Sequence, residues 1–338
     1  MKTSRRTSGK TWAVLGFLSQ VALGAVLSQP SAVLAKSHSH RAEPADRAAA
    51  PAEAKASKSR SKAAPVSKLH YLRIGKGPAV VFLHGMGGDL SSWIEEAQRL
   101  EKNHTVLLID LPGHGASAVP PQGIDLVDIG REVALIVTQE KLAPATLVGH
   151  SLGAVVAGYA ALSDKTVARS VVMVDSLVDP YPISRDARAK LRTSLEREQA
   201  RALRDFFGAG TRDAGQLDKI IAAATRVKPK VLMGYLDFAC ERDDLAERIA
   251  EIKVPVHAMV SPVMTQGKSD PVQVQAILNK AGFTDLANFS FDYIEGSKHW
   301  PHWDQPDVFH AMLSKHLARV EGTPAGRPVA KVPAASRN

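Results

Sequence analysis

The segment Gly149-His150-Ser151-Leu152-Gly153 governs how the rest of the chain is interpreted. It follows an apolar run of strand length at residues 145–148 and precedes an apolar stretch of helix length at residues 152–163. A sharp turn between a strand and a helix leaves little room around its middle residue, so the residues two positions away must be small. Such a turn raises the Ser151 hydroxyl at a helix N-terminus, where N–H groups and the helix dipole favour negative charge. The pattern indicates a nucleophilic serine, and a serine that only caps a helix is the alternative.

Strand-length and helix-length segments alternate on both sides of this motif. The apolar, β-branched-rich runs lie at residues 69–74, 79–83, 105–110, 145–148, 170–174, 254–260 and 289–294. Amphipathic stretches of helix length lie between most of them, at residues 91–102, 126–140, 152–163 and 307–320. Such alternation favours an α/β fold, a mostly parallel sheet with helices on both faces.

Residues from about 180 to 252 break the alternation. The stretch is charged and rich in alanine, and its pattern predicts helices over 188–206, 216–226 and 232–249 without a strand. It separates two predicted strands by far more residues than one crossover helix needs. We therefore expect an inserted helical lid over the carboxyl ends of the strands, the edge where open α/β sheets bind their ligands.

A second glycine-rich motif, His84-Gly85-Met86-Gly87-Gly88, directly follows the run at residues 79–83. Glycines let the backbone approach a reacting carbonyl group closely. We expect the backbone N–H groups of Met86 and Leu152 to form an oxyanion hole, in which each donor is worth about 10²–10³-fold in rate.

The third motif, Gly296-Ser297-Lys298-His299-Trp300-Pro301, follows the last predicted strand. A histidine on this loop can reach the same edge of the sheet and remove the Ser151 proton. His299 is the candidate base, and its position after the serine fits the chain order serine, acid, histidine. His302 is the alternative, although packing beside Trp303 is the simpler interpretation of that residue.

Taken together, the chain resembles the α/β-hydrolase fold superfamily. The resemblance spans nearly the whole folded part and rests on the motifs at residues 84–88, 110–115 and 149–153 and on His299 followed by Asp304-Gln305-Pro306. It implies an eight-stranded sheet with an early antiparallel strand, a Ser–His–acid triad and a lid that shapes the pocket. It also implies that residues 110–115 form a structural turn, so neither Asp110 nor His114 is assigned to catalysis.

The acid of the triad is where this sequence departs from the family pattern. Met264 stands at the usual acid position, and Asp270, in a Gly-x-x-Asp-Pro segment, comes six residues late. Asp270 before Pro271 also fits a plain helix N-cap. The other family position is the end of the preceding strand, where Asp175 follows residues 170–174. We favour Asp175 as the acid and keep Asp270 as the alternative.

The expected activity is hydrolysis of carboxylic esters or related acyl compounds through an acyl-enzyme, with no metal or organic cofactor and a small-molecule acyl substrate. A serine at residue 151 argues against the haloalkane dehalogenases and epoxide hydrolases, which the resemblance otherwise includes. The alternatives on the same fold are a C–C or peptide-bond hydrolase and a haloperoxidase-like esterase. The displaced acid also leaves open a binding protein that has kept the fold but lost the chemistry.

The net charge of +9 does not indicate a nucleic-acid-binding surface. Residues 1–66 carry +8 and residues 321–338 carry +2, so residues 67–320 are nearly neutral at −1. The basic tails could contact an anionic cell envelope weakly, but a solvated tail is the simpler expectation.

The single cysteine, Cys240, excludes an intrachain disulfide framework.

The N-terminus has the pattern of an export signal. Basic residues within the first ten positions precede a mostly apolar stretch at residues 11–27, and Val33 and Ala35 fit a cleavage site after Ala35. An uncleaved anchor is the alternative. The expected organisation is a signal at 1–35, a disordered Ala/Pro/Lys linker at 36–66, the α/β domain at 67–320 and a disordered tail at 321–338. The expected location is periplasmic or secreted, and the oligomeric state is left open.

Overall fold

The computed structural model describes residues 69–284 and 286–322. The predicted signal and linker, and the predicted tail beyond residue 322, lie outside the described residues. None of the described helices is both long enough and apolar enough to span a membrane.

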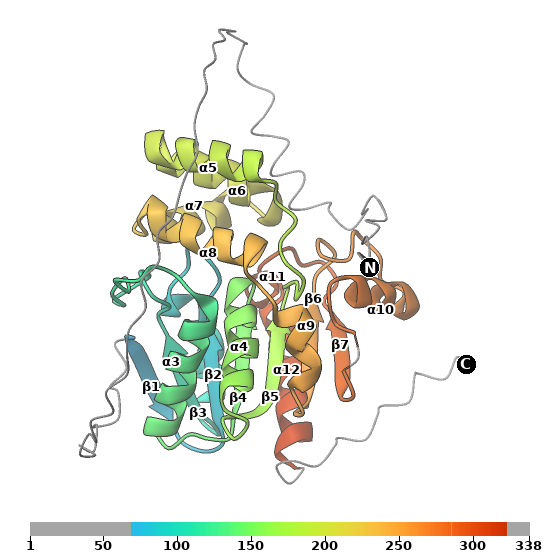
Figure 1. Ribbon diagram of the computed structural model, residues 1–338. Coiled ribbons are helices and arrows are strands. Elements are labelled where there is room, and N and C mark those ends of the chain that lie inside the picture. The colour runs from blue at the N-terminus through green and yellow to red at the C-terminus, as the bar shows by residue number, and fades with distance from the viewer. Residues whose placement is uncertain (1–68, 285, 323–338) are drawn as a thin grey trace, which may run out of the picture.

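One twisted sheet forms the centre of the protein (Figure 1). Its strand order is β1-β3-β2-β4-β5-β6-β7, and β1 pairs antiparallel with β3 while the other neighbours are parallel. The strands are β1 (Tyr71–Gly75), β2 (Ala79–Leu83), β3 (Thr105–Ile109), β4 (Ala145–His150), β5 (Ala168–Val174), β6 (Val256–Val260) and β7 (Phe289–Tyr293). This is the predicted α/β class.

The described sheet has seven strands, whereas the resemblance implied eight. Each of the seven apolar runs identified in the sequence accounts for one strand, with ends that shift by at most two residues. No strand-length apolar run is left over in the described residues to form another.

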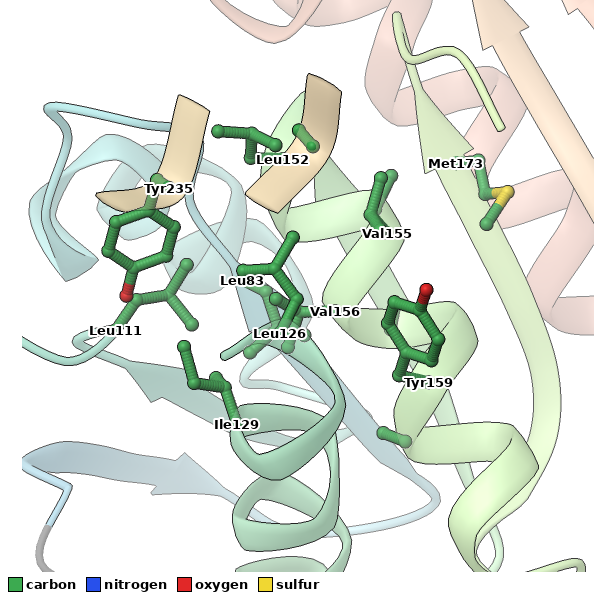
Figure 2. Packing of buried hydrophobic residues seen from close by; sticks show 14 of the residues in the cluster. Leu83, Leu111, Leu126, Ile129, Leu152, Val155, Val156, Tyr159, Met173 and Tyr235 are labelled. Carbon is green, nitrogen blue, oxygen red and sulfur yellow. The ribbon is translucent and has the colours of Figure 1, made fainter. Parts of the chain in front are cut away.

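Helices cover both faces of the sheet, so strands such as β2 and β3 are buried on both sides. Val81 and Leu83 face the core under α3 (Leu126–Gln139) and α4 (Leu152–Ser163). Figure 2 shows Leu83 in this core, close to Leu126 of α3. The intervening Val80 and Phe82 point to the opposite face, under α2 (Ile94–Leu100) and α12 (Pro306–Glu321). Because successive side chains of a strand point to opposite faces, both sets are buried, and β2 is accordingly apolar throughout.

Most of the helical insertion (residues 180–252) lies above the carboxyl ends of the strands, and its last part, residues 245–251, returns beside α4 (Figure 1). It contains α5 (Arg185–Arg197), α6 (Gln199–Phe207), η2 (Gly208–Gly210), α7 (Ala214–Ala224), α8 (Pro229–Glu241), α9 (Leu245–Arg248) and η3 (Ile249–Glu251). The remaining helices are η1 (Leu90–Trp93), α10 (Pro271–Lys280) and α11 (Pro301–Asp304).

Two of the three helices predicted in the insertion are wrong in extent, because each is broken. The helix predicted over 188–206 is divided between α5 and α6 at Glu198, whose φ of −143° and ψ of 67° are not helical. The helix predicted over 232–249 stops before Asp243 and Asp244, which bond to the Tyr159 hydroxyl of α4 at 2.7 and 2.9 Å. Tertiary contacts therefore decided this second break, and periodicity alone could not show them.

Candidate active site

Ser151 stands in a strained turn between β4 and α4. Its φ of 53° and ψ of −125° lie outside the regions that L-residues normally adopt. A Cβ on Gly149 would lie 2.2 Å from the Gly153 carbonyl oxygen, and one on Gly153 would lie 2.5 Å from the His84 carbonyl oxygen. Both glycines are therefore required by close backbone contacts, which is the steric reason given for the motif.

Asp175 and His299 meet at the carboxyl edge of the sheet. Asp175 directly follows β5, and its Oδ2 accepts a hydrogen bond from His299 Nδ1 at 2.7 Å. Its Oδ1 accepts the backbone N–H of Ser261, which follows β6, at 2.8 Å. The bond to Nδ1 selects the histidine tautomer whose Nε2 is unprotonated and can accept a proton.

The structure places the two alternative residues elsewhere. Asp270 is the N-cap of α10 and accepts the N–H groups of Val272 and Gln273, both at 3.1 Å. His302 stacks on Trp93 with ring centroids 4.1 Å apart, and its two ring nitrogens have no hydrogen-bond partner within residues 69–284 and 286–322. Burial lowers the pKa of His302 to about 3, so the ring is neutral.

The His299 backbone is held from two directions. Its N–H donates to the carbonyl oxygen of Gly210 in the helical insertion at 3.0 Å. Its carbonyl oxygen accepts Nε2–H of His150, the residue before Ser151, at 2.6 Å. Burial holds the pKa of His150 well below its usual range, so this ring is a neutral donor. The turn that carries Ser151 and the loop that carries His299 are thus directly bonded.

The loop after β2 lies against the Ser151 turn. A Cβ on Gly85 would lie 3.2 Å from the Ser151 Cβ and 2.9 Å from His150 Nδ1, so only glycine permits this approach. Met86 and Leu152, the two expected oxyanion donors, line the same cavity as Ser151.

The same loop is held by a buried histidine. The Gly87 N–H donates to His114 Nε2 at 3.0 Å. Burial lowers the pKa of His114 to about 3, which keeps that nitrogen an acceptor. His114 therefore fixes the backbone directly beside Met86.

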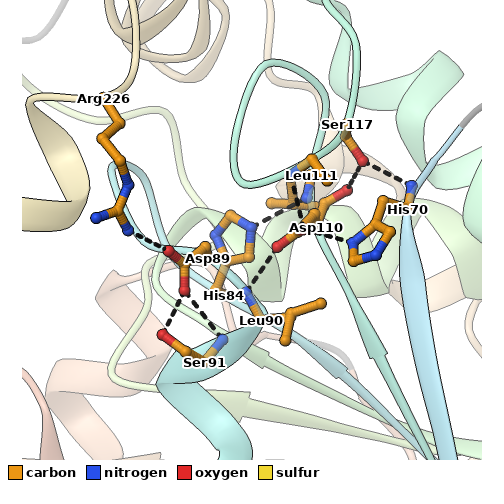
Figure 3. A network of polar contacts seen from close by, with 10 residues as sticks. His70, His84, Asp89, Leu90, Ser91, Asp110, Leu111, Ser117 and Arg226 are labelled. Atoms are coloured by element: carbon orange, nitrogen blue, oxygen red, sulfur yellow. Dashed lines mark hydrogen bonds and ion pairs between the residues drawn. The ribbon is translucent and has the colours of Figure 1, made fainter.

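A polar network fixes the base of this loop, as Figure 3 shows. His84 Nε2 accepts the Leu111 N–H at 3.0 Å, and the Asp110 carboxylate accepts the Leu90 N–H at 2.8 Å and bonds His70 Nδ1 at 2.8 Å. Asp110 is therefore occupied by structural bonds, as the resemblance implied.

An ion pair joins this loop to the insertion. Asp89 pairs with Arg226 at 2.7 Å (Figure 3). The loop after β2 is thus held both by the sheet below it and by the insertion above it.

A cavity of about 850 Å³ opens between the carboxyl edge and the helical insertion. Ser151, Asp175 and His299 line it. Its apolar wall includes Met86, Leu177, Phe206, Phe207, Ile220, Leu236, Val263, Met264, Trp300 and Trp303. Phe206 and Phe207 of α6 line the cavity. Tyr235 and Phe238 are buried in the core, where the Tyr235 hydroxyl donates to the Pro112 carbonyl oxygen at 3.0 Å.

Sequence reasoning missed Tyr181 and Ser176. The Ser176 hydroxyl donates to the Ser151 carbonyl oxygen at 2.9 Å, and the buried Tyr181 phenol lines the cavity beside them. Burial raises the pKa of Tyr181 to about 12, partly offset by hydrogen bonding with the Ser176 and Ser151 side chains. Only their nearness to Asp175 in the chain could have pointed to them.

The described ranges contain no cluster of three or more His, Cys, Asp or Glu side chains that could hold a metal ion. The features that do converge are the strained serine, the aspartate–histidine pair and the cavity that all three line. On this fold they define a site of the hydrolase class.

Comparison with known proteins gives the same class. Residues 80–312 match the model of the alpha/beta hydrolase family, which is more than half of the chain. This chain belongs to the alpha/beta hydrolase family, a family of enzymes.

The individual proteins found in the comparisons have modest sequence identity with this chain. The chain is 28% identical over 215 residues to a pimeloyl-[acyl-carrier protein] methyl ester esterase of Pseudoalteromonas atlantica, covering 57% of this chain and 81% of that protein. It is 36% identical over 108 residues to a dihydrolipoyllysine-residue acetyltransferase component of Cupriavidus necator, but this covers only 32% of this chain and 29% of that protein. The solved esterase of Thermogutta terrifontis superposes with a TM-score of 0.64 at 20% identity over 75% of this chain and 93% of that chain, a likeness of fold.

Proposed function

We propose that this protein is an exported serine hydrolase that cleaves carboxylic esters, or related acyl compounds, through an acyl-enzyme. The observation that carries the proposal is the 2.7 Å bond between Asp175 and His299 on the wall of the cavity that Ser151 also lines. The serine hydroxyl is a weak nucleophile by itself and needs an adjacent base that a third group orients.

Each residue has a defined role in the proposed reaction. His299 Nε2 removes the Ser151 proton as the hydroxyl attacks the acyl carbonyl carbon. The N–H groups of Met86 and Leu152 stabilise the tetrahedral oxyanion. The leaving alcohol departs with the proton from His299, and water then attacks the acyl-enzyme with His299 again as the base. Asp175 holds the imidazole in the required tautomer and stabilises the imidazolium that forms.

The substrate class is supported by the cavity and by the relatives. A volume of about 850 Å³ with a largely aliphatic and aromatic wall suits a small-molecule acyl group. The Pseudoalteromonas relative is named for hydrolysis of a methyl ester, so a carboxylic ester is the favoured substrate. The hydrogen bond between His299 and Asp175 argues against a non-catalytic binding role, which the sequence favoured only because Met264 stands at the usual acid position.

A fluorophosphonate probe tests the activity. We expect covalent labelling of the wild-type protein and none of Ser151→Ala at equal folding, measured by intact-protein mass spectrometry. A series of p-nitrophenyl esters with increasing acyl length then defines the acyl preference. Absence of labelling and of hydrolysis across the series would refute the proposed function.

Export has a separate test, because it rests on residues 1–35 alone. Mass spectrometry of the mature protein from a bacterial envelope fraction should find an N-terminus at Lys36. Recovery of the protein only in the cytoplasm with its N-terminus intact would contradict export and leave the hydrolase proposal standing.

A further inference from the structure

Asp304 is a buried carboxylate that the proposed reaction does not use. It is 4% exposed and ends α11, five residues after His299. Its Oδ2 accepts the backbone N–H of Lys298 at 2.6 Å, and its Oδ1 accepts Nε2–H of Gln216 at 2.6 Å. The carboxylate therefore joins the residue next to His299 to helix α7 of the insertion.

Gln216 is itself held in a single orientation. Its Oε1 accepts the Arg212 N–H at 2.6 Å, which leaves Nε2 as the donor to Asp304. The Arg212 guanidinium donates to the Asp304 carbonyl oxygen at 3.2 Å, and the Gly210 carbonyl oxygen accepts the His299 N–H at 3.0 Å. Three hydrogen bonds thus connect residues 210–216 of the insertion with the loop that carries His299.

We propose that residues 210–216 are a positioning element for the base. Asp304, oriented by Gln216, holds the backbone beside His299, so the placement of Nε2 depends on the insertion being docked in this arrangement. The inference rests on the proposed roles of Ser151 and His299. This role differs from that of a pocket wall, because it makes the chemical step itself depend on the insertion.

The physical basis is the sensitivity of proton transfer to geometry. A displacement of about 1 Å in a reacting group can cost about 10²-fold in rate. The N–H groups of Lys298 and His299 are both satisfied by acceptors whose positions the insertion sets. Loss of the Gln216 bond leaves a buried carboxylate oxygen unpaired and allows the loop to move.

The size of the substrate separates this role from a pocket-shaping role. A pocket wall contributes most to long acyl chains and acts mainly on KM. A positioning element lowers kcat for every ester, including p-nitrophenyl acetate, whose acyl group is too small to depend on the aromatic wall.

A reciprocal exchange provides the test. Gln216→Glu removes the donor and sets two carboxylates against each other, and Asp304→Asn leaves one oxygen for two donors. The double variant restores the bond in the reverse direction, because the amide introduced at position 304 donates to the carboxylate introduced at position 216 and still accepts from the Lys298 N–H. We expect each single variant to lower kcat on p-nitrophenyl acetate by about 10–10²-fold with little change in KM. The double variant should return to within about threefold of the wild type.

Gln199→Glu is the matched control. Gln199 lies in the same insertion, and its Nε2 donates to the Val227 carbonyl oxygen at 2.6 Å, a bond within the insertion. This variant should lower the melting temperature without lowering kcat on the acetate. If circular dichroism shows a single variant to be unfolded, Gln216→Ala replaces it, since it removes the donor without adding charge, and the same loss of kcat is expected.

The outcomes are distinct. Unchanged kcat on the acetate in folded single variants, or a double variant no better than the singles, would overturn the inference. If the wild-type protein neither reacts with a fluorophosphonate nor cleaves any ester, the proposed function fails instead.

Discussion

Nδ1 of His299 lies 2.7 Å from Oδ2 of Asp175, although 124 positions separate the two residues in the chain. The acid follows β5, while Ser261 follows the adjacent β6 and donates its N–H to the other carboxylate oxygen at 2.8 Å. The Asp175 N–H also donates to the Met259 carbonyl oxygen at 2.9 Å, which continues the ladder between the two strands. Because neighbouring parallel strands end at the same edge, a carboxylate at the end of β5 can reach the same histidine as one placed after β6.

This relationship predicts unequal effects at the two candidate acids. Asp175→Asn should lower kcat by about 10³–10⁴-fold, because the amide favours the wrong histidine tautomer. Asp270→Asn should keep nearly full activity, because asparagine caps a helix about as well as aspartate. Steady-state kinetics on a p-nitrophenyl ester measure both effects. A larger loss in the Asp270 variant would refute the assignment of Asp175.

His114 should affect the rate without touching the substrate. His114→Phe removes the acceptor of the Gly87 N–H and leaves a buried donor unpaired, which costs about 1–3 kcal/mol. We expect kcat to fall by about 10–10²-fold as the neighbouring Met86 N–H moves out of line. His114→Gln, which can present an oxygen to Gly87, should recover part of the loss. Equal activity of His114→Phe and the wild type would show that the loop keeps its shape without this bond.

Two glycines give a steric comparison. Gly153→Ala should abolish activity and lower the melting temperature strongly, because its Cβ would lie 2.5 Å from the His84 carbonyl oxygen and 2.5 Å from the Leu83 carbonyl oxygen. Gly208→Ala should fold normally, since its Cβ would meet nothing closer than 3.9 Å. Thermal unfolding followed by circular dichroism measures both. A stable, active Gly153→Ala protein would contradict the close approach of α4 to the loop after β2.

Asp243 should make the free energy of unfolding depend on pH. Burial, aided by the nearby Asp244 charge, raises the pKa of Asp243 to about 6, while the Tyr159 hydroxyl opposes the shift. An acid whose folded pKa exceeds its unfolded pKa destabilises the fold as pH rises between the two values, here from about 4 to 6. The cost above that range is at most about 3 kcal/mol.

Asp243→Asn should remove this cost, because asparagine can still accept the Tyr159 and Leu245 hydrogen bonds through its oxygen. Urea denaturation should show a stabilising effect at pH 7.5 that largely disappears at pH 4. A gain in the free energy of unfolding that is the same at both pH values, or a loss at pH 7.5, would contradict an ionisable carboxyl group at this buried position.

Local rules were enough to predict the α/β class, the seven described strands and the turn at Ser151. The hydrophobic periods of strands and helices can be recognised in consecutive residues. The turn needs small residues at a fixed short spacing, as the Cβ positions at Gly149 and Gly153 show. The grouping of residues 84–88, Ser151 and His299 followed from the same rules, because parallel strands end at one edge.

Only the tertiary structure decided which aspartate meets His299. In the sequence, Asp175 and Asp270 both stand at plausible positions for the acid. The pairing depends on which carboxylate the folded sheet brings within 2.7 Å of His299 Nδ1. The break between α8 and α9 and the Gln216–Asp304–Lys298 connection have the same origin. Each joins residues that are distant in the chain or that belong to separate elements. A hydrogen bond of this kind depends on positions in space, which no local pattern of residue types records.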